Sequence, residues 1–170
     1  MRWIIGGVLV AVCTAIGIQT GNIYTARRKL ISQLLYALAV LDGEIAYSMT
    51  PLKRAFGHIC ETCTGPTSKL FGACAEEMGT GRQPFREIWA KQLEQMQQHA
   101  PLMEEEADIL LELGNNLGRN DQENQQKALE QARMHLLQLE GEARAAEKKY
   151  TVLHRSLGLI GGLFLAVMLL

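Results

Sequence analysis

Several features of strand-rich and nucleic-acid-binding proteins are scarce in this chain of 170 residues. Only 4 residues are proline and only 6% are aromatic, and no segment alternates apolar and polar residues as a half-buried strand does. The formal net charge is −1, which leaves no excess of positive charge for a nucleic-acid-binding face. Good helix formers such as Leu, Ala, Glu and Gln are abundant instead. The composition therefore predicts one all-α domain of ordinary size.

Charged residues are also absent from both ends of the chain, from Trp3 to Ala26 and from Ser156 to Leu170. Basic residues directly flank both uncharged runs, at 27–29 and at Lys148, Lys149 and Arg155. Basic residues near a membrane span stay on its cytoplasmic side. We therefore predict an N-terminal transmembrane helix over residues 1–26, a cytoplasmic helical bundle over 27–155 and a C-terminal membrane helix over 156–170.

Each membrane prediction has an alternative. The first run could be a cleaved signal peptide, although no clear small-residue cleavage site follows it. The last run covers about 21 Å of helix against roughly 30 Å of hydrocarbon, so it could be a buried core helix. Small residues four positions apart, as at Gly158 and Gly162, would let the two end helices pack closely and offset this mismatch.

Apolar residues between the two ends recur at helical spacing. They predict that the first helix continues to about residue 49, and that further helices begin at Thr50-Pro51, near residue 67, at Pro84 and at Pro101. From Leu129 onward, apolar residues follow an a/d pattern for more than five heptads. We interpret the whole as an antiparallel bundle of about six helices. Self-association through a coiled coil is the alternative.

The stretch His58-Ile-Cys-Glu-Thr-Cys63 contains a Cys-x-x-Cys pair, and Cys74 follows eleven residues later. A structural zinc site needs four converging ligands, and a thioredoxin-like site needs a βαβ context. The pattern instead places Cys60, Cys63 and Cys74 on apolar helix faces, where cysteine behaves as a small buried hydrophobe. We predict core packing, with metal and redox sites as alternatives. No catalytic, metal or cofactor site is predicted, and an enzyme is not expected.

Two stretches carry a resemblance to a known family: "EIAYSMTPLKRAF" at Glu44–Phe56 and "LELGNNLGRNDQENQ" at Leu111–Gln125. Together with the leading span, the following Arg-Arg, the length and the apolar tail, they resemble the stage III sporulation protein AB family. The resemblance implies a helical bundle similar to the cytoplasmic domain of type II secretion inner-membrane platform proteins. It also implies a place in the channel-like complex between mother cell and forespore, in the mother-cell membrane around the forespore.

The partners that this resemblance implies are a cytoplasmic secretion-type ATPase, the other membrane proteins of the channel complex and the membrane itself. No nucleic acid is expected, and a homo-oligomer is also compatible with the sequence. The rival functions are a tail-anchored coiled-coil protein that organises membranes and a metal-dependent or redox membrane enzyme.

The candidate residues fall into two groups. The positions expected to shape the fold, as helix starts, turn formers or motif residues, are Thr50, Pro51, Leu52, Leu113, Gly114, Gly118 and Gln125. The positions expected to bind a partner are Glu44, Asn116, Arg119, Asp121, Glu104, Glu105 and Asp108. Asp121 also has the character of a helix start, and the acids from Glu104 onward suit the first turn of a helix with a solvated face.

Overall fold

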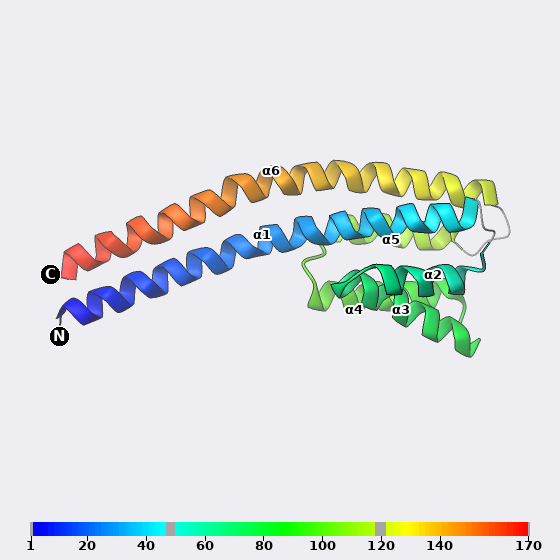
Figure 1. Cartoon of the computed structure of the whole chain (residues 1–170), viewed down its shortest axis with the longest axis horizontal. Coiled ribbons are helices and arrows are strands. Elements are labelled where there is room, and N and C mark those ends of the chain that lie inside the picture. The colour runs from blue at the N-terminus through cyan, green and yellow to red at the C-terminus, as the bar shows by residue number, and fades with distance from the viewer. Residues whose placement is uncertain (1, 47–49, 118–121, 170) are drawn as a thin grey trace. The chain divides into compact units, whose positions relative to one another are not determined.

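The computed structural model describes residues 2–46, 50–117 and 122–169, and it describes side chains within 22–46, 50–117 and 123–150. The described residues form six helices and no strand, so the predicted all-α bundle is confirmed (Figure 1). The helices are α1 (Arg2–Ala46), α2 (Leu52–Thr62), α3 (Gly65–Thr80), α4 (Phe85–His99), α5 (Glu104–Asn116) and α6 (Gln122–Leu169).

The chain divides into two structural units. The bundle unit comprises residues 29–140 and therefore holds all of α2–α5 with the adjoining parts of α1 and α6. The paired-end unit comprises residues 1–28 and 141–170. The helices α1 and α6 each contribute residues to both units without a break in the helix.

The core of the bundle unit follows the predicted apolar faces. On α1 the buried residues include Leu30, Leu34, Leu38, Leu41 and Ile45, whereas Met49 lies outside the described residues. On α6 they are Leu129, Ala132, Leu136 and Leu139. This part of the a/d stripe is therefore buried within a single chain, as the bundle interpretation requires.

Four aromatic side chains fill the centre of α2, α3 and α4. Phe56 packs edge-on against Phe71 with a centroid separation of 4.8 Å, and Trp89 lies 5.6 Å from Phe71 and 5.7 Å from Phe56. Phe85 adds a contact of 5.6 Å to Phe56. Aromatic pairs at such separations stabilise a core beyond the area they bury. Consecutive helices from α2 to α5 pack against one another in chain order.

Three helix boundaries differ from the prediction. Thr50 is not the N-cap of α2, because the Pro51 carbonyl accepts the first helical hydrogen bonds, from the N–H groups of Arg54 (2.8 Å) and Ala55 (3.2 Å). The helix predicted near residue 67 starts at Gly65, since Pro66 in the first turn needs no N–H partner. The helix predicted at Pro101 starts at Glu104.

The late start of α5 has a local cause. The carboxylate of Glu106 accepts a hydrogen bond of 2.8 Å from the backbone N–H of Met103, which closes a capping box at that residue. The side chain of Glu106 is consequently buried, whereas a solvated acidic face was predicted for it. The neighbouring Glu104, Glu105 and Asp108 are exposed as predicted.

Gly114 is not a turn former, which corrects the prediction for this position. It is buried inside α5, where the indole of Trp89 lies directly over it. A side chain at position 114 would overlap this ring, so the glycine permits the close approach of α4 to α5.

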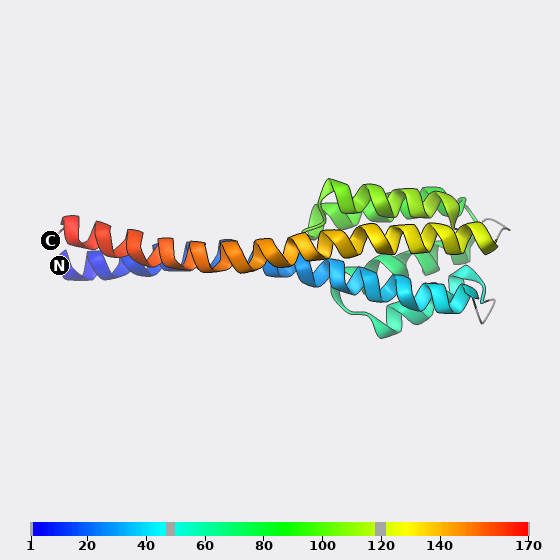
Figure 2. The same cartoon turned by 90° about the horizontal axis from the view of Figure 1, so that it is seen from above.

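The paired-end unit is held together by contacts between α1 and α6. The rings of Tyr24 and Tyr150 stack with centroids 4.9 Å apart, and Arg28 forms an ion pair with Glu147. In Figures 1 and 2 the N- and C-terminal ends of this helix pair lie together. Within residues 22–46, 50–117 and 123–150, no helix carries an apolar stretch long enough to cross a bilayer. The membrane helices predicted over 1–26 and 156–170 fall mostly on residues whose side chains lie outside the description.

Candidate docking site

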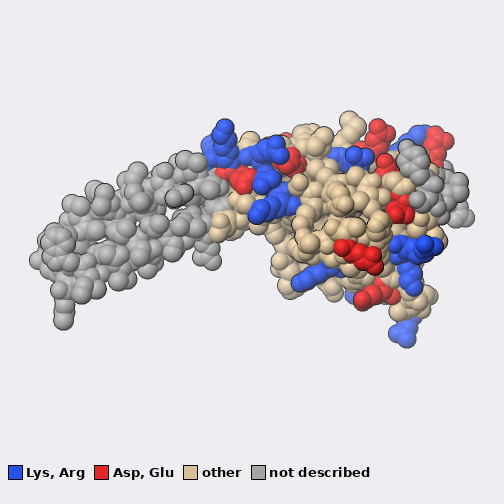
Figure 3. Space-filling view, viewed as in Figure 1, with Lys and Arg blue, Asp and Glu red and all other residues tan. Residues whose placement is uncertain are grey.

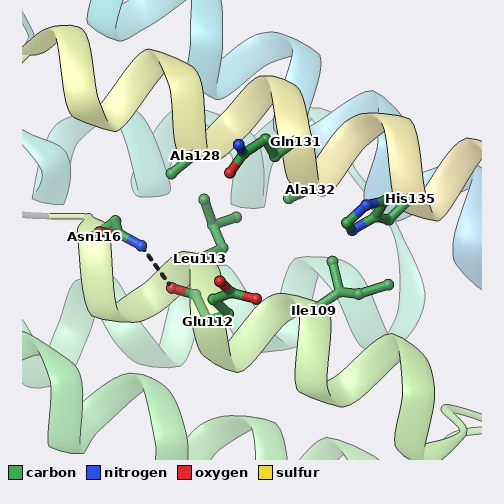
Figure 4. Close-up of a pocket in the computed structure, with 8 residues that line it drawn as sticks. All are labelled: Ile109, Glu112, Leu113, Asn116, Ala128, Gln131, Ala132 and His135. Carbon is green, nitrogen blue, oxygen red and sulfur yellow. Dashed lines mark hydrogen bonds between the residues drawn. The ribbon is translucent and has the colours of Figure 1, made fainter.

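A groove runs between α5 and α6, and its two adjoining hollows share Ile109, Glu112 and His135 (Figure 4). We call it the α5/α6 groove. The other residues that line it are Glu105, Asp108, Leu113 and Asn116 from α5, and Ala128, Gln131, Ala132, Gln138 and Leu139 from α6. Figure 4 shows Gln131 and His135 extending from α6 toward the α5 side of the smaller hollow.

The base of the groove is apolar because it is the edge of the core. Leu113 and Leu139 are buried, and the small side chain of Ala132 leaves room between the two helices. Ile109 is half-buried and bridges the two hollows. Because Leu113, Leu139 and Ala132 are buried beneath the groove, the half-buried Ile109 is the larger apolar side chain that the groove offers to a partner.

The wall contributed by α5 is acidic. Glu105, Asp108 and Glu112 are spaced at i, i+3 and i+7, which places them on one side of the helix. All three are exposed, and no ion pair forms to them within the part of the chain that the structure describes. The amide of Asn116 donates to the backbone carbonyl of Glu112 at 3.1 Å, so the Glu112 carboxylate is not engaged by it.

No Lys or Arg lines the groove. The cations nearest along α6 have partners of their own: Lys127 pairs with Glu123 at 2.6 Å, and Arg133 lies 3.7 Å from Asp42. The groove consequently combines an apolar base with uncompensated negative charge.

Glu44 belongs to a separate polar cluster at the end of α1. Its carboxylate accepts hydrogen bonds from the Thr50 hydroxyl at 2.7 Å and lies 2.9 Å from His58 Nδ1. The hydrogen bond from Thr50, then the one with His58, lowers the pKa of Glu44. This cluster ties the end of α1 to α2, so the structure gives Glu44 and Thr50 a shared structural contact.

The remaining candidates are distributed along the bundle unit. Asn116 ends α5, about 18 Å by helical rise from Glu104 at its start. Gln125 lies in the first turn of α6, half-buried and outside the groove. Gly118, Arg119 and Asp121 lie outside the described residues. Pro51 and Leu52 start α2, and Leu113 is buried under the groove.

The end of α1 and the start of α6, which carry parts of the two family-like stretches, lie at one end of the bundle unit. Figures 1 and 2 show the end of α1 beside the start of α6, and the Arg133–Asp42 contact links the same helices.

The sequence analysis did not identify four residues that line the groove: Glu112, Gln131, His135 and Gln138. A short connection between two helices predicts that they are antiparallel neighbours, but it does not say which of their polar residues face each other.

The cysteines occupy the predicted core positions in two of three cases. Cys63 and Cys74 are buried, whereas Cys60 is half-buried and its Sγ lies 3.5 Å from the Ser68 hydroxyl. Burial raises the pKa of the Cys63 thiol and raises that of Cys74 to about 12, where Glu77 adds a smaller effect. Both thiols therefore remain protonated at neutral pH. Among the described side chains, no group of His, Cys, Asp or Glu converges as metal ligands would.

These features define a class: a small all-α protein in which the first part of α1 pairs with the last part of α6 and the remaining helices form a bundle. The model of the stage III sporulation protein AB family matches residues 2–170, so the chain belongs to this family and is a sporulation protein. The chain is 33% identical over 171 residues to "Stage III sporulation protein AB" of Bacillus subtilis (strain 168), covering 100% of both chains.

A solved structure agrees with this assignment. The chain is similar to the structure of "Stage III sporulation protein AB (SpoIIIAB)" with a TM-score of 0.68 and 31% identity. The match covers 73% of this chain and 98% of the other.

Proposed function

We propose that this protein is a membrane-anchored adaptor of a secretion-like channel complex between mother cell and forespore. In this proposal both end helices enter the mother-cell membrane around the forespore, and the bundle unit lies in the cytoplasm. There it docks a cytoplasmic secretion-type ATPase, and it acts by binding rather than by catalysis. Family membership supports the role in sporulation, and the proposal adds the membrane, the channel complex and the partner.

The observation that carries the proposal is the register between α1 and α6 in the paired-end unit. Because Tyr24 stacks on Tyr150 and Arg28 pairs with Glu147, the basic residues at 27–29 and 148–149 lie at one level of the helix pair. Figure 3 shows Lys and Arg gathered, with a few acids among them, where the described surface ends. Two basic clusters at one level would hold both end helices in the same orientation.

Labelling of engineered cysteines tests the membrane arrangement. Gly81 itself has a left-handed backbone (φ 63°), but the neighbouring Arg82 is exposed in the loop after α3, so Arg82→Cys offers an accessible site. In a Cys-free background, a membrane-impermeant thiol reagent should label this site only after the cells are opened. Labelling in intact cells would refute a cytoplasmic bundle unit.

Binding of the ATPase tests the adaptor role. The full-length protein in detergent should retain a purified cytoplasmic secretion-type ATPase from the same organism, whereas unrelated ATPases should pass through. Arg119→Glu, at a position between α5 and α6 in the sequence, should weaken retention of the ATPase while leaving the melting temperature nearly unchanged. If the wild type does not retain the ATPase at all, the docking role is wrong.

A further inference from the structure

We propose that the α5/α6 groove binds a basic amphipathic helix of a partner protein. This inference deepens the proposed adaptor function, because it specifies the chemistry of the segment that docks. It depends on the geometry of the groove and on its charge, and each points to the same kind of occupant.

The shape of the groove suits a helix. Its two hollows adjoin each other between α5 and α6 and share the half-buried Ile109. A helix that lies along such a groove presents residues spaced at i, i+3 or i+4 and i+7 to it. Ile109 would contact the apolar face of that helix, while its flanking residues face the polar rim of the groove.

The charge of the groove specifies the rest of the occupant. Glu105, Asp108 and Glu112 stand about 4.5 and 6 Å apart along the helix axis by their three- and four-residue steps. Lys or Arg residues spaced at i, i+3 and i+7 on a neighbouring helix match these steps. Because the nearby Lys127 and Arg133 already have acidic partners, the described residues supply no cation to this wall.

The α6 side of the groove adds neutral polar groups rather than charge. The exposed Gln131 can both donate and accept hydrogen bonds, and His135 can do either according to its tautomer. An acidic segment would meet three like charges, and a purely apolar helix would leave these carboxylates without partners. A basic amphipathic helix satisfies both the apolar base and the acidic wall.

A designed peptide tests this proposal without using the ATPase. The probe is a fluorescent helical peptide with lysines at i, i+3 and i+7 beside a leucine face. Full-length protein in neutral detergent should raise its anisotropy, and added salt should weaken the binding. Two comparison peptides carry glutamate in place of lysine or the same residues in scrambled order, and both should bind at least tenfold more weakly.

Matched variants of the protein locate the binding. Glu105→Gln, Asp108→Asn and Glu112→Gln together should weaken binding of the basic peptide about tenfold, as expected for three exposed charge pairs. The control combines Glu61→Gln, Glu76→Gln and Glu94→Gln, which remove the same charge from exposed positions on α2, α3 and α4. It should bind like the wild type. Ile109→Ala should weaken binding without changing its salt dependence.

Three outcomes would overturn the proposal. The wild type could fail to distinguish the basic peptide from the acidic one, or the control variant could lose as much binding as the groove variant. The groove variant could also change the sedimentation of the protein alone, which would make a second copy of this chain the occupant. If the ATPase is retained but the peptide does not bind, the groove proposal is wrong and the adaptor function stands. If the peptide binds but the ATPase is not retained, the adaptor function is wrong and the groove proposal stands.

Discussion

Replacement of Gly114 by alanine tests how α4 packs against α5. Alanine normally stabilises the interior of a helix by about 1 kcal/mol relative to glycine. Here the added Cβ would lie 2.6 Å from Nε1 of Trp89 and closer still to the neighbouring ring carbon. Because Trp89 is buried and packs against three aromatic rings, its indole cannot move away freely.

The cost also includes a hydrogen bond. The indole N–H of Trp89 donates to the backbone carbonyl of Leu110 at 2.7 Å, across the surface that Gly114 leaves bare. Overpacking usually costs about 1–3 kcal/mol, and a lost hydrogen bond costs about 0.5–1.5 kcal/mol. After the gain in helix propensity is subtracted, we expect Gly114→Ala to destabilise the protein by about 2 kcal/mol. The melting temperature should fall by roughly 4–8 °C.

Thermal unfolding followed by circular dichroism measures this effect. The matched control is Gly57→Ala in α2, where a Cβ would meet no atom within 4 Å, and this change should stabilise the protein. Combining Gly114→Ala with Trp89→Leu should remove most of the additional penalty, since contacting residues give non-additive effects. The reasoning is refuted if Gly114→Ala is as stable as Gly57→Ala.

Two further predictions concern buried thiols and acid stability. Cys74→Ala should cost roughly 1 kcal/mol and Cys74→Ser more, measured by urea unfolding, because a buried hydroxyl would need a partner. The pKa of Cys74 is raised from 9.0 to about 12, so the free energy of unfolding of the wild type should fall as the pH rises above 9.0. This fall should be smaller in Cys74→Ala, and an equal fall would contradict the raised pKa. The pKa of Glu44 is lowered from 4.5, so its contribution is present above pH 4.5 and is lost as the pH falls through the lowered pKa. Urea unfolding at neutral and acidic pH should show that Glu44→Gln loses less stability on acidification than the wild type does. Equal losses would show that the hydrogen bonds of Glu44 do not stabilise the fold.

The helices and their buried faces could be predicted because they depend on local periodicity. Leu129, Leu136 and Leu139 recur at a/d spacing, and burial of this stripe requires only that some neighbour cover it. The errors arose where a residue's role depends on a distant partner. Gly114 resembles a helix terminator in sequence, yet its role is set by Trp89, which stands 25 positions earlier on another helix.

The candidate site was only partly predictable for the same reason. Glu105 and Asp108 were identified because acids at the start of a helix form a visible local pattern. The facing Gln131 and His135 and the buried Leu139 come from α6, and local pattern does not fix which face of one helix meets another. The contact of Glu44 with His58 likewise joins two helices whose relative angle cannot be obtained from residue spacing.

The contact between the first and last helices has a consequence for the order of folding. Arg28 and Glu147 are separated by 119 positions, whereas each helix from α2 to α5 packs on its neighbour in sequence. Closing a long loop costs more entropy than closing a short one, so near-neighbour contacts form first. We expect the Tyr24–Tyr150 and Arg28–Glu147 contacts to form after the transition state. Changes there would then speed unfolding while leaving the folding rate almost unaltered, so the lifetime of the native protein is set at its paired ends.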